Sequence, residues 1–214
     1  MERNVIDVYD KSIFEMRNVF TAEECQEFID YHEQSPNKRQ GTLMRAENLN
    51  LKKSVDIYIS DPTNNLLKRY IEGLKKVHME YTKHLQSIFG ENSVLPIINR
   101  GYSRGIIIQR TDKGGYFHWH SDYTKSRMLA VIIYLNDINE ENGGSTEFNS
   151  GRKVQPETGK VLMFPTTDLH LHRGNTILNG HSKYIISGFI LDPNIETQTK
   201  NITSHTPKFP FIFK

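Results

Sequence analysis

The chain has 214 residues, and its 36% hydrophobic and 24% charged content is typical of one soluble globular domain. Its 27 basic and 25 acidic side chains are mixed along the sequence, so the net charge of +2 does not favour nucleic-acid binding. The apolar runs are too short for a membrane helix, and the single cysteine, Cys25, excludes a cysteine-rich metal site. We therefore expect a cytoplasmic protein with no nucleic-acid partner and no membrane association.

The first predicted helix begins after Thr21. Thr21 and Glu24 have the spacing of a capping box, which satisfies free amide groups at a helix start. The apolar stripe that follows consists of Phe28, Ile29 and Tyr31. This helix should end before Pro36. The next stretch, residues 36–56, is polar and has few helix or strand signals, so we expect a loop that could carry binding residues.

A longer helix is predicted from about Pro62 to Phe89. Asp61 is a suitable N-cap, Pro62 suits the first turn, and Gly90 follows the last turn. Its apolar positions recur every three or four residues and form one stripe: Leu67, Tyr70, Ile71, Leu74, Val77, His78, Tyr81, Leu85 and Ile88. We interpret His78 as a core histidine, because no set of metal-binding side chains lies near it in the sequence.

From about residue 97 the pattern changes to short β-rich runs separated by glycine-rich turns. The predicted strands are Gly105–Arg110, Tyr116–Trp119, Met128–Leu135, Lys160–Phe164, Leu169–His172 and Tyr184–Leu191. Many short strands with such turns favour a β-sandwich or a jelly roll. The helices of the first half would then cover one sheet.

Four of the nine histidines lie in two short segments. His118 and His120 precede Asp122 in the first segment, and the second contains His170 and His172. In a strand, side chains two residues apart point to the same face, so His120 and Asp122 would present an imidazole beside a carboxylate. A histidine from a distant strand would complete the set of two histidines and one carboxylate that ferrous iron uses in oxygenases. The His-x-Asp pattern alone is weak.

Neighbouring motifs strengthen this interpretation. A glycine-rich turn leads into His-x-Asp at Gly114–Asp122, and a strand ends in Tyr-Leu-Asn within Ile133–Asp137. A Gly-Gly-x-Thr-x-Phe turn follows at Gly143–Phe148, and then a strand with Pro156, Gly159 and Phe164. Last comes a distal histidine, His172, followed by Gly180 and the basic residue Lys183. In this order they resemble the prolyl 4-hydroxylase-like family of iron(II)- and 2-oxoglutarate-dependent dioxygenases. The resemblance covers about residues 14–191.

The resemblance implies a mainly β fold with flanking helices, a double-stranded β-helix or jelly roll. The whole chain would form a single domain. Its parts would be an N-terminal helical support at about 14–90, a jelly-roll core at about 97–191 and a C-terminal tail at 192–214.

The resemblance also implies the chemistry and most of the site. His120, Asp122 and His172 would hold Fe(II), and 2-oxoglutarate and O2 would be cosubstrates, with ascorbate as a compatible reductant. Lys183 would bind the C5 carboxylate of 2-oxoglutarate, because a buried carboxylate is costly unless paired. Tyr134 matches a family position that can reach the same carboxylate. Where the family often has a tyrosine this chain has Thr111 nearby, so Tyr116 is a candidate substitute.

The family implies hydroxylation of an unactivated C–H bond with release of succinate and CO2. The substrate would be a prolyl residue in a peptide or protein, and the alternative is a free amino acid or another small molecule. His118, Trp119 and Arg173 are candidate substrate residues because they are close in sequence to the metal ligands. Arg127 is interpreted as a surface or packing residue.

Other interpretations use the same residues differently. His170 could replace His172 by strand alternation, but the spacing to Lys183 favours His172. A cupin would need a glutamate soon after His120, but Thr124 and Lys125 stand there. The nucleic-acid-repair branch of the superfamily would use an arginine past the distal histidine. A non-catalytic jelly-roll metal-binding module is the rival from another functional class.

The tail is polar until its last residues, Phe209–Phe213, which are mostly apolar. Such an end seldom stays in water. It would pack on its own domain or on a second subunit, and the second arrangement would make a homodimer.

Overall fold

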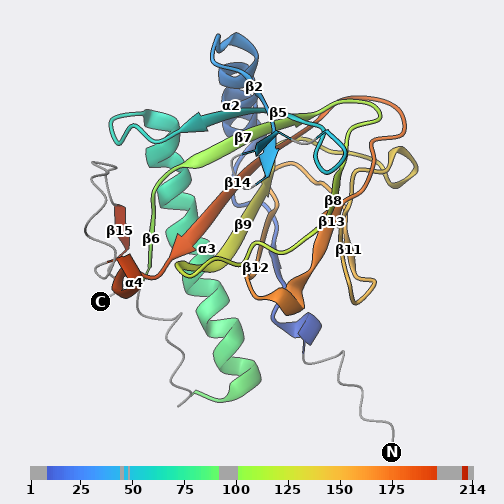
Figure 1. Ribbon diagram of the computed structural model, residues 1–214. Helices are drawn as coiled ribbons and strands as arrows, with labels where there is room; N and C mark the ends of the chain where they lie inside the picture. The colour runs from blue at the N-terminus through green and yellow to red at the C-terminus, as the bar shows by residue number, and fades with distance from the viewer. Residues whose placement is uncertain (1–8, 44–45, 48, 92–100, 197–208, 212–214) are drawn as a thin grey trace, which may run out of the picture.

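Two facing β-sheets with helices outside the larger one form the fold of the computed structural model (Figure 1). The structure describes residues 9–43, 46–47, 49–91, 101–196 and 209–211. The predicted fold class, a mainly β jelly roll with flanking helices, is confirmed. None of the helices in these ranges combines the length and apolar character that crossing a membrane requires.

The larger sheet is antiparallel throughout. Its main path runs through β1 (Phe14–Met16), β12 (Val161–Pro165), β9 (Arg127–Tyr134), β14 (Lys183–Leu191), β7 (Ile106–Thr111), β5 (Val55–Ile59) and β2 (Arg39–Gln40). Off this path, β6 (Gly101–Ser103) pairs with β14 and with β15 (Phe209–Phe211). Phe209–Phe211 therefore add a short strand to the larger sheet.

The smaller sheet faces the larger one and consists of four short strands. Their order is β11 (Lys153–Val154), β10 (Thr146–Phe148), β13 (His172–Gly174) and β8 (Phe117–His120). A separate hairpin joins β3 (Thr42–Leu43) and β4 (Ala46–Glu47), and single turns of 3-10 helix lie at Glu140–Asn142 and Asp168–His170. A last helical turn, α4 (Pro193–Glu196), follows β14.

The helix α2 (Ala22–Gln34) begins with the predicted capping box. The Thr21 hydroxyl accepts from the Glu24 amide at 3.2 Å, and the Glu24 carboxylate accepts from the Thr21 amide at 2.9 Å. Cys25, Phe28 and His32 are buried, whereas Tyr31 is exposed. The helix therefore buries a narrow stripe that is offset from the predicted one.

The helix α3 (Asn65–Phe89) begins three residues later than predicted. Asn64, and not Asp61, is its N-cap, because the Asn64 side chain accepts from the Leu66 amide at 2.9 Å. The Asp61 carboxylate instead accepts from the Thr63 amide, which closes a local turn. The predicted stripe, with His78 in it, is buried against the larger sheet, and only its last member, Ile88, is partly exposed.

The prediction of a loop at residues 36–56 was wrong. The segment contains β2, β3, β4 and the start of β5, and β5 pairs with β7 along its whole length. The sequence did not predict these strands because most of them are very short. β2, β3 and β4 have two residues each, which is too few to show an apolar period. β1, β6, β10, β11 and β15 were also missed, each of three residues or fewer.

Alternation along the central strand β9 divides the interior into two layers. Leu129, Val131 and Ile133 face the helices, whereas Ala130 and Ile132 face the smaller sheet. The first layer is a closed apolar core. The second layer is apolar at one end and opens into the pocket that carries the site.

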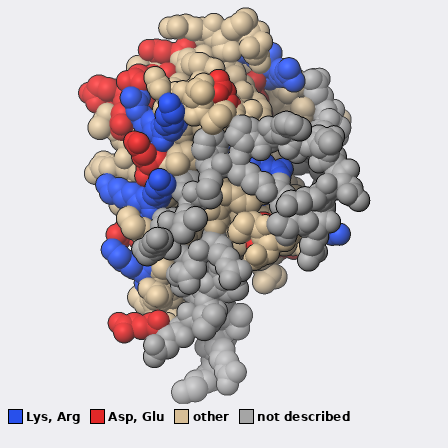
Figure 2. Space-filling view, turned by 90° about the vertical axis from the view of Figure 1, so that its left-hand side faces the viewer, with Lys and Arg blue, Asp and Glu red and all other residues tan. Residues whose placement is uncertain are grey.

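Charges on the surface are mixed. Figure 2, which views the described residues from the left-hand side of Figure 1, shows acidic and basic side chains interspersed on that face. No single-sign patch of the kind that attracts nucleic acid stands out there.

Candidate metal centre

Three side chains from the smaller sheet and its adjoining loop converge on one point. His120 ends β8, Asp122 follows in the loop, and His172 begins β13; one ligand atom of each lies within 4.8 Å of the others. His172 Nε2 is 3.6 Å from Asp122 Oδ2, and the two imidazole centroids are 4.2 Å apart. His120 and His172 are direct partners in the β8–β13 ladder.

Strand alternation was the wrong reason for expecting this arrangement. β8 ends at His120, so Asp122 lies in a loop and not on the same strand face. A bulge also interrupts β8, because three steps from Phe117 to His120 oppose two steps from Gly174 to His172. The bulge turns Phe117 toward the pocket with His120, and the two rings stack at 3.6 Å.

Backbone carbonyls orient both imidazoles. His120 Nδ1 donates to the His118 carbonyl at 2.7 Å, and His172 Nδ1 donates to the His170 carbonyl at 3.0 Å. Because a carbonyl only accepts, both Nδ1 atoms carry the proton and both Nε2 lone pairs are free to bind a metal. Burial and the neighbouring His172 lower the pKa of His120 to about 3, so its ring is neutral at neutral pH.

This donor set fits a ferrous ion. Two imidazoles and one carboxylate on the same side leave the opposite positions free, which suits non-haem iron and not a closed structural zinc site. Arg127 supports the carboxylate: its Nη1 donates to the Asp122 carbonyl at 3.3 Å and lies 3.8 Å from Asp122 Oδ1.

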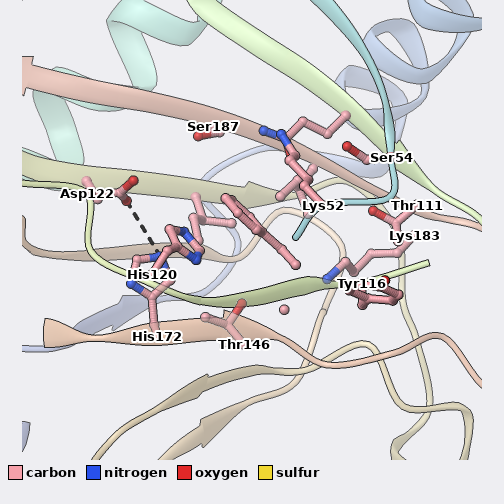
Figure 3. Close-up of a pocket in the computed structure, with 16 residues that line it drawn as sticks. Lys52, Ser54, Thr111, Tyr116, His120, Asp122, Thr146, His172, Lys183 and Ser187 are labelled. Carbon is pink, nitrogen blue, oxygen red and sulfur yellow. Dashed lines mark ion pairs between the residues drawn. The ribbon is translucent and has the colours of Figure 1, made fainter. Parts of the chain in front are cut away.

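A pocket between the two sheets extends from this centre. Figure 3 shows His120, Asp122 and His172 at one end and Lys183 with Tyr116 at the other. Ala130, Ile132 and Ile185 supply apolar walls, and the polar wall residues are Lys52, Ser54, Gln109, Thr111, Thr146 and Ser187.

Lys183, at the far end of the pocket, is a buried cation. Its side chain is 4% exposed, and its Nζ donates to the Gly144 carbonyl at 2.8 Å. Burial lowers its pKa to about 8. No carboxylate of the described residues forms an ion pair with it, so the pocket can accept an anionic group there.

Comparison with known proteins agrees with this geometry. The profile of the 2OG-Fe(II) oxygenase superfamily matches residues 106–191. The chain is similar to this superfamily over that segment, which contains His120, Asp122, His172 and Lys183. Fe(II), 2-oxoglutarate and O2 are accordingly the metal and cosubstrates of this oxygenase. A search of curated proteins found no match.

Solved structures similar to the oxygenase include prolyl hydroxylases. A viral collagen prolyl hydroxylase from Paramecium bursaria Chlorella virus-1, in a 2OG complex, is 17% identical with a TM-score of 0.62, over 88% of this chain and 99% of that one. A Trichoplax adhaerens prolyl hydroxylase, in complex with a hypoxia-inducible-factor peptide fragment, is 15% identical with a TM-score of 0.68, over 93% and 91%. A Pseudomonas putida prolyl-4-hydroxylase is 13% identical with a TM-score of 0.65, over 87% and 97%. The fold is therefore that of prolyl 4-hydroxylases.

The two candidate tyrosines occupy different places in the oxygenase. Tyr116 lines the pocket, and its hydroxyl donates to the Leu49 carbonyl at 3.0 Å. Tyr134 is fully buried behind the wall, where its hydroxyl donates to Thr146 Oγ1 at 2.8 Å. Thr146, and not Tyr134, reaches the pocket.

The candidate substrate residues lie outside the pocket. His118 is exposed, contrary to the expectation that it shares the face of His120, because the bulge turns it away. Trp119 is 42% exposed and stacks under the Arg173 guanidinium at 4.8 Å, and Arg173 pairs with Glu147 on the outer face of the smaller sheet.

His170 is buried away from the metal centre. Its Nδ1 is 2.8 Å from the Thr167 hydroxyl, its Nε2 is 2.8 Å from the Ser12 hydroxyl, and the Tyr9 ring stacks on it. Both ring nitrogens are thus engaged in fixing the N-terminal segment. The choice of His172 over His170 as the converging histidine is supported by this geometry.

Sequence reasoning missed Lys52 and Ser54, which come from the segment predicted as a loop. Lys52 is buried, its Nζ bonds Asp56 at 2.7 Å, and it lies 5.1 Å from the Phe117 ring centroid. The Ser54 hydroxyl bonds the other oxygen of Asp56 at 2.7 Å. The period-two spacing of these three polar residues, at the start of an apolar strand, was the signal available in the sequence.

Proposed function

We propose that the oxygenase hydroxylates an unactivated C–H bond of a prolyl residue in a peptide or protein, with release of succinate and CO2. One observation carries this proposal: two free imidazole nitrogens and a carboxylate converge at one end of a pocket whose other end holds a buried lysine without a carboxylate partner. Fe(II) with a chelating dicarboxylate would satisfy both ends.

In this proposal His120, Asp122 and His172 hold Fe(II). The Nδ1 bonds to backbone carbonyls orient both rings. Arg127 orients the Asp122 carboxylate. These contacts would hold the three side chains in place for the metal.

Lys183 would bind the C5 carboxylate of 2-oxoglutarate. Thr146, held by Tyr134, and Tyr116 line the same pocket and would add hydrogen bonds, so the proposed role of Tyr134 is indirect. The apolar walls would keep water from the cosubstrate.

The bound iron would supply the oxidative chemistry that couples 2-oxoglutarate decarboxylation to hydroxylation. The chain's own contribution is to fix the two ends of the cosubstrate and to leave the remaining metal positions facing the target. Ascorbate is a compatible external reductant that would keep the iron ferrous.

The fold favours a prolyl substrate, since the similar solved structures are prolyl hydroxylases. The same chemistry on a free amino acid or other small molecule is the alternative. A non-catalytic metal-binding module would have no need for the buried lysine of the pocket.

The decisive assay measures succinate release from labelled 2-oxoglutarate with Fe(II), together with the visible absorption of Co(II) bound in its place. Asp122→Ala should lose both signals. Asp168→Ala removes a nearby exposed carboxylate, bonded to Ser121, and should retain both. Full succinate release from the Asp122 variant would refute the metal assignment.

A homodimer through the C-terminal tail remains a second proposal. β15 is paired with β6 on one side, and an edge strand can add a strand from another copy. Sedimentation should show a dimer for the full chain and a monomer for a chain ending at residue 208. A monomeric full chain would rule this out. The cytoplasmic location likewise remains a prediction from cysteine usage.

A further inference from the structure

One face of β14 connects the cosubstrate pocket to a second hollow. Alternate side chains of a strand share a face, so Lys183, Ile185, Ser187, Phe189 and Leu191 form one row. The first three line the pocket between the sheets, and the last three line an adjacent groove. Ser187 belongs to both, so the groove continues from the pocket.

The metal centre lies beside this junction. Arg127 lines the groove and contacts Asp122, which lines the pocket. The order along the row is therefore the cosubstrate cation at Lys183, the metal centre, and then the groove. A substrate in the groove would lie next to Asp122, at the end of the pocket away from Lys183 (Figure 3).

The charged side chains among the described residues that line the groove are basic. Arg104 and Arg127 line it, and none of the described residues that line it is an aspartate or glutamate. Its other lining residues are apolar or hydroxyl-bearing: Tyr58, Ile107, Thr124, Ser126, Phe189 and Leu191. Among charged groups of a ligand, the groove therefore suits an anion.

The Arg127 guanidinium is held in place for such a contact. It stacks on the Phe189 ring at 3.6 Å, and its side chain is one-third exposed. The carboxylate beside it, Asp122, is a proposed metal ligand and also faces His172. Asp122 is therefore shared between Arg127 and the candidate metal centre. A stacked guanidinium still offers donors at its edge to a carboxylate.

The groove length favours a peptide. From Ser187 to Leu191 a strand rises about 13 Å, the length of about four extended residues. A free amino acid would fill only the end next to the metal. An extended peptide would reach both arginines.

We infer that this groove binds an acidic side chain of the substrate, so that the oxygenase prefers a prolyl residue flanked by Asp or Glu. The inference rests on the proposed function and adds the substrate class. It assigns Arg104 and Arg127 to substrate specificity, in place of His118, Trp119 and Arg173.

The test uses blocked seven-residue peptides with a central proline in an alanine background. Asp, Asn or Lys is placed singly at each of the six flanking positions, and peptide-stimulated succinate release and the mass of the peptide are measured. At one or more positions the Asp peptide should have a KM about tenfold below that of its Asn counterpart, and the Lys peptide should be the poorest.

Charge-swap variants locate the contact. Arg104→Glu should reverse the preference at the affected position, so that the Lys peptide becomes better than the Asp peptide. Arg127→Gln should reduce the Asp-over-Asn preference, and Co(II) absorption reports separately whether its metal site is intact. Arg69→Gln makes the same charge change on α3, where Arg69 pairs with Glu24 and Glu27, and should keep the wild-type preference.

The outcomes separate this inference from the proposed function. Turnover of the prolyl peptides with equal KM values for the Asp and Asn peptides overturns the inference alone. A response only to free amino acids, or to none of the peptides, overturns the inference together with the proposed prolyl-peptide substrate, but leaves the 2-oxoglutarate chemistry standing. An unchanged preference in Arg104→Glu and Arg127→Gln also overturns it. Absence of 2-oxoglutarate turnover in every condition overturns both.

Discussion

Lys183 and Lys52 are two buried lysines in the same pocket, and they differ in their partners. Lys52 forms an ion pair with Asp56 at 2.7 Å, so its charge is balanced within the fold. Lys183 has a backbone carbonyl as its acceptor, which leaves its charge unbalanced by any carboxylate in the described part of the pocket. A buried charge without a counter-ion costs stability and is retained where a ligand supplies the counter-ion.

Replacing Lys183 by Met should therefore separate binding from stability. We expect at least tenfold weaker 2-oxoglutarate binding, because a charge-assisted hydrogen bond is lost. The ligand-free protein should become more stable by about 1–3 kcal/mol at pH 7, since an apolar side chain replaces a buried charge. Calorimetry with Mn(II) and urea unfolding measure the two effects. Unchanged 2-oxoglutarate affinity would remove Lys183 from the cosubstrate site.

The pKa of Lys183 also predicts a pH dependence. Its pKa is about 8 in the folded chain and about 10.5 when exposed. Between these values the unfolded chain binds more protons, so this group makes stability rise with pH there. The affinity for 2-oxoglutarate should instead fall as pH rises through 8, because the ammonium loses its proton. Lys183→Met should lack this fall, and an affinity that is constant from pH 7 to 9 in the wild type would contradict it.

At the scale of elements, the turn at Gly143 and Gly144 sets the position of the carbonyl that Lys183 binds. Both glycines have positive φ, 77° and 70°. A Cβ on Gly143 would lie 2.1 Å from the Thr176 carbonyl oxygen, whereas one on Gly151, also at positive φ, would meet nothing within 4 Å. The close approach of Thr176 therefore explains why the first position of the Gly-Gly-x-Thr-x-Phe motif is a glycine.

Gly151→Ala is the matched control for Gly143→Ala. Both place an alanine at positive φ, which costs about 1–2 kcal/mol. Gly143→Ala should cost about 1–3 kcal/mol more, because the turn must also move away from Thr176. Urea unfolding of the two variants measures the difference. Equal losses of stability would show that the close approach at Gly143 does not matter.

Short elements also account for most errors of the sequence-based prediction. α2, α3 and the long strands β9 and β14 were predicted to within a few residues, because each has a clear local signal: a capping box in α2, an apolar stripe in α3 and apolar runs in the two strands. β1, β2 and β10 have two or three residues each, too few for a period to be read. The β8 bulge could not be predicted, because its cause is the register with β13, which lies far away in the chain.

For the whole molecule, ligand binding should couple the two sheets. The proposed metal ligands belong to the smaller sheet and its loop, whereas Lys183 belongs to the larger one. A cosubstrate bound to both would tie the sheets together. Binding to the folded state alone stabilises it by about 2.7 kcal/mol at a ligand concentration a hundred times Kd.

Mn(II) with 2-oxoglutarate should therefore raise the Tm by about 5–10 °C. Mn(II) alone should have a smaller effect. Asp122→Ala should show neither shift, whereas Asp168→Ala should behave as the wild type. Differential scanning fluorimetry without oxygen measures all four conditions. A full shift in Asp122→Ala would mean that the ligands bind elsewhere.

The sequence by itself determined the class of fold, the order of the motifs and the three side chains that converge in the candidate metal centre, because helix stripes, turn glycines and His-x-Asp are local patterns. Only the tertiary structure decided which side chains face the pocket. A bulge in β8 exposes His118, the burial of Tyr134 leaves Thr146 in the wall, and Lys52 enters from a stretch without periodicity. Each of these depends on contacts between strands far apart in the chain, and local sequence does not encode such register.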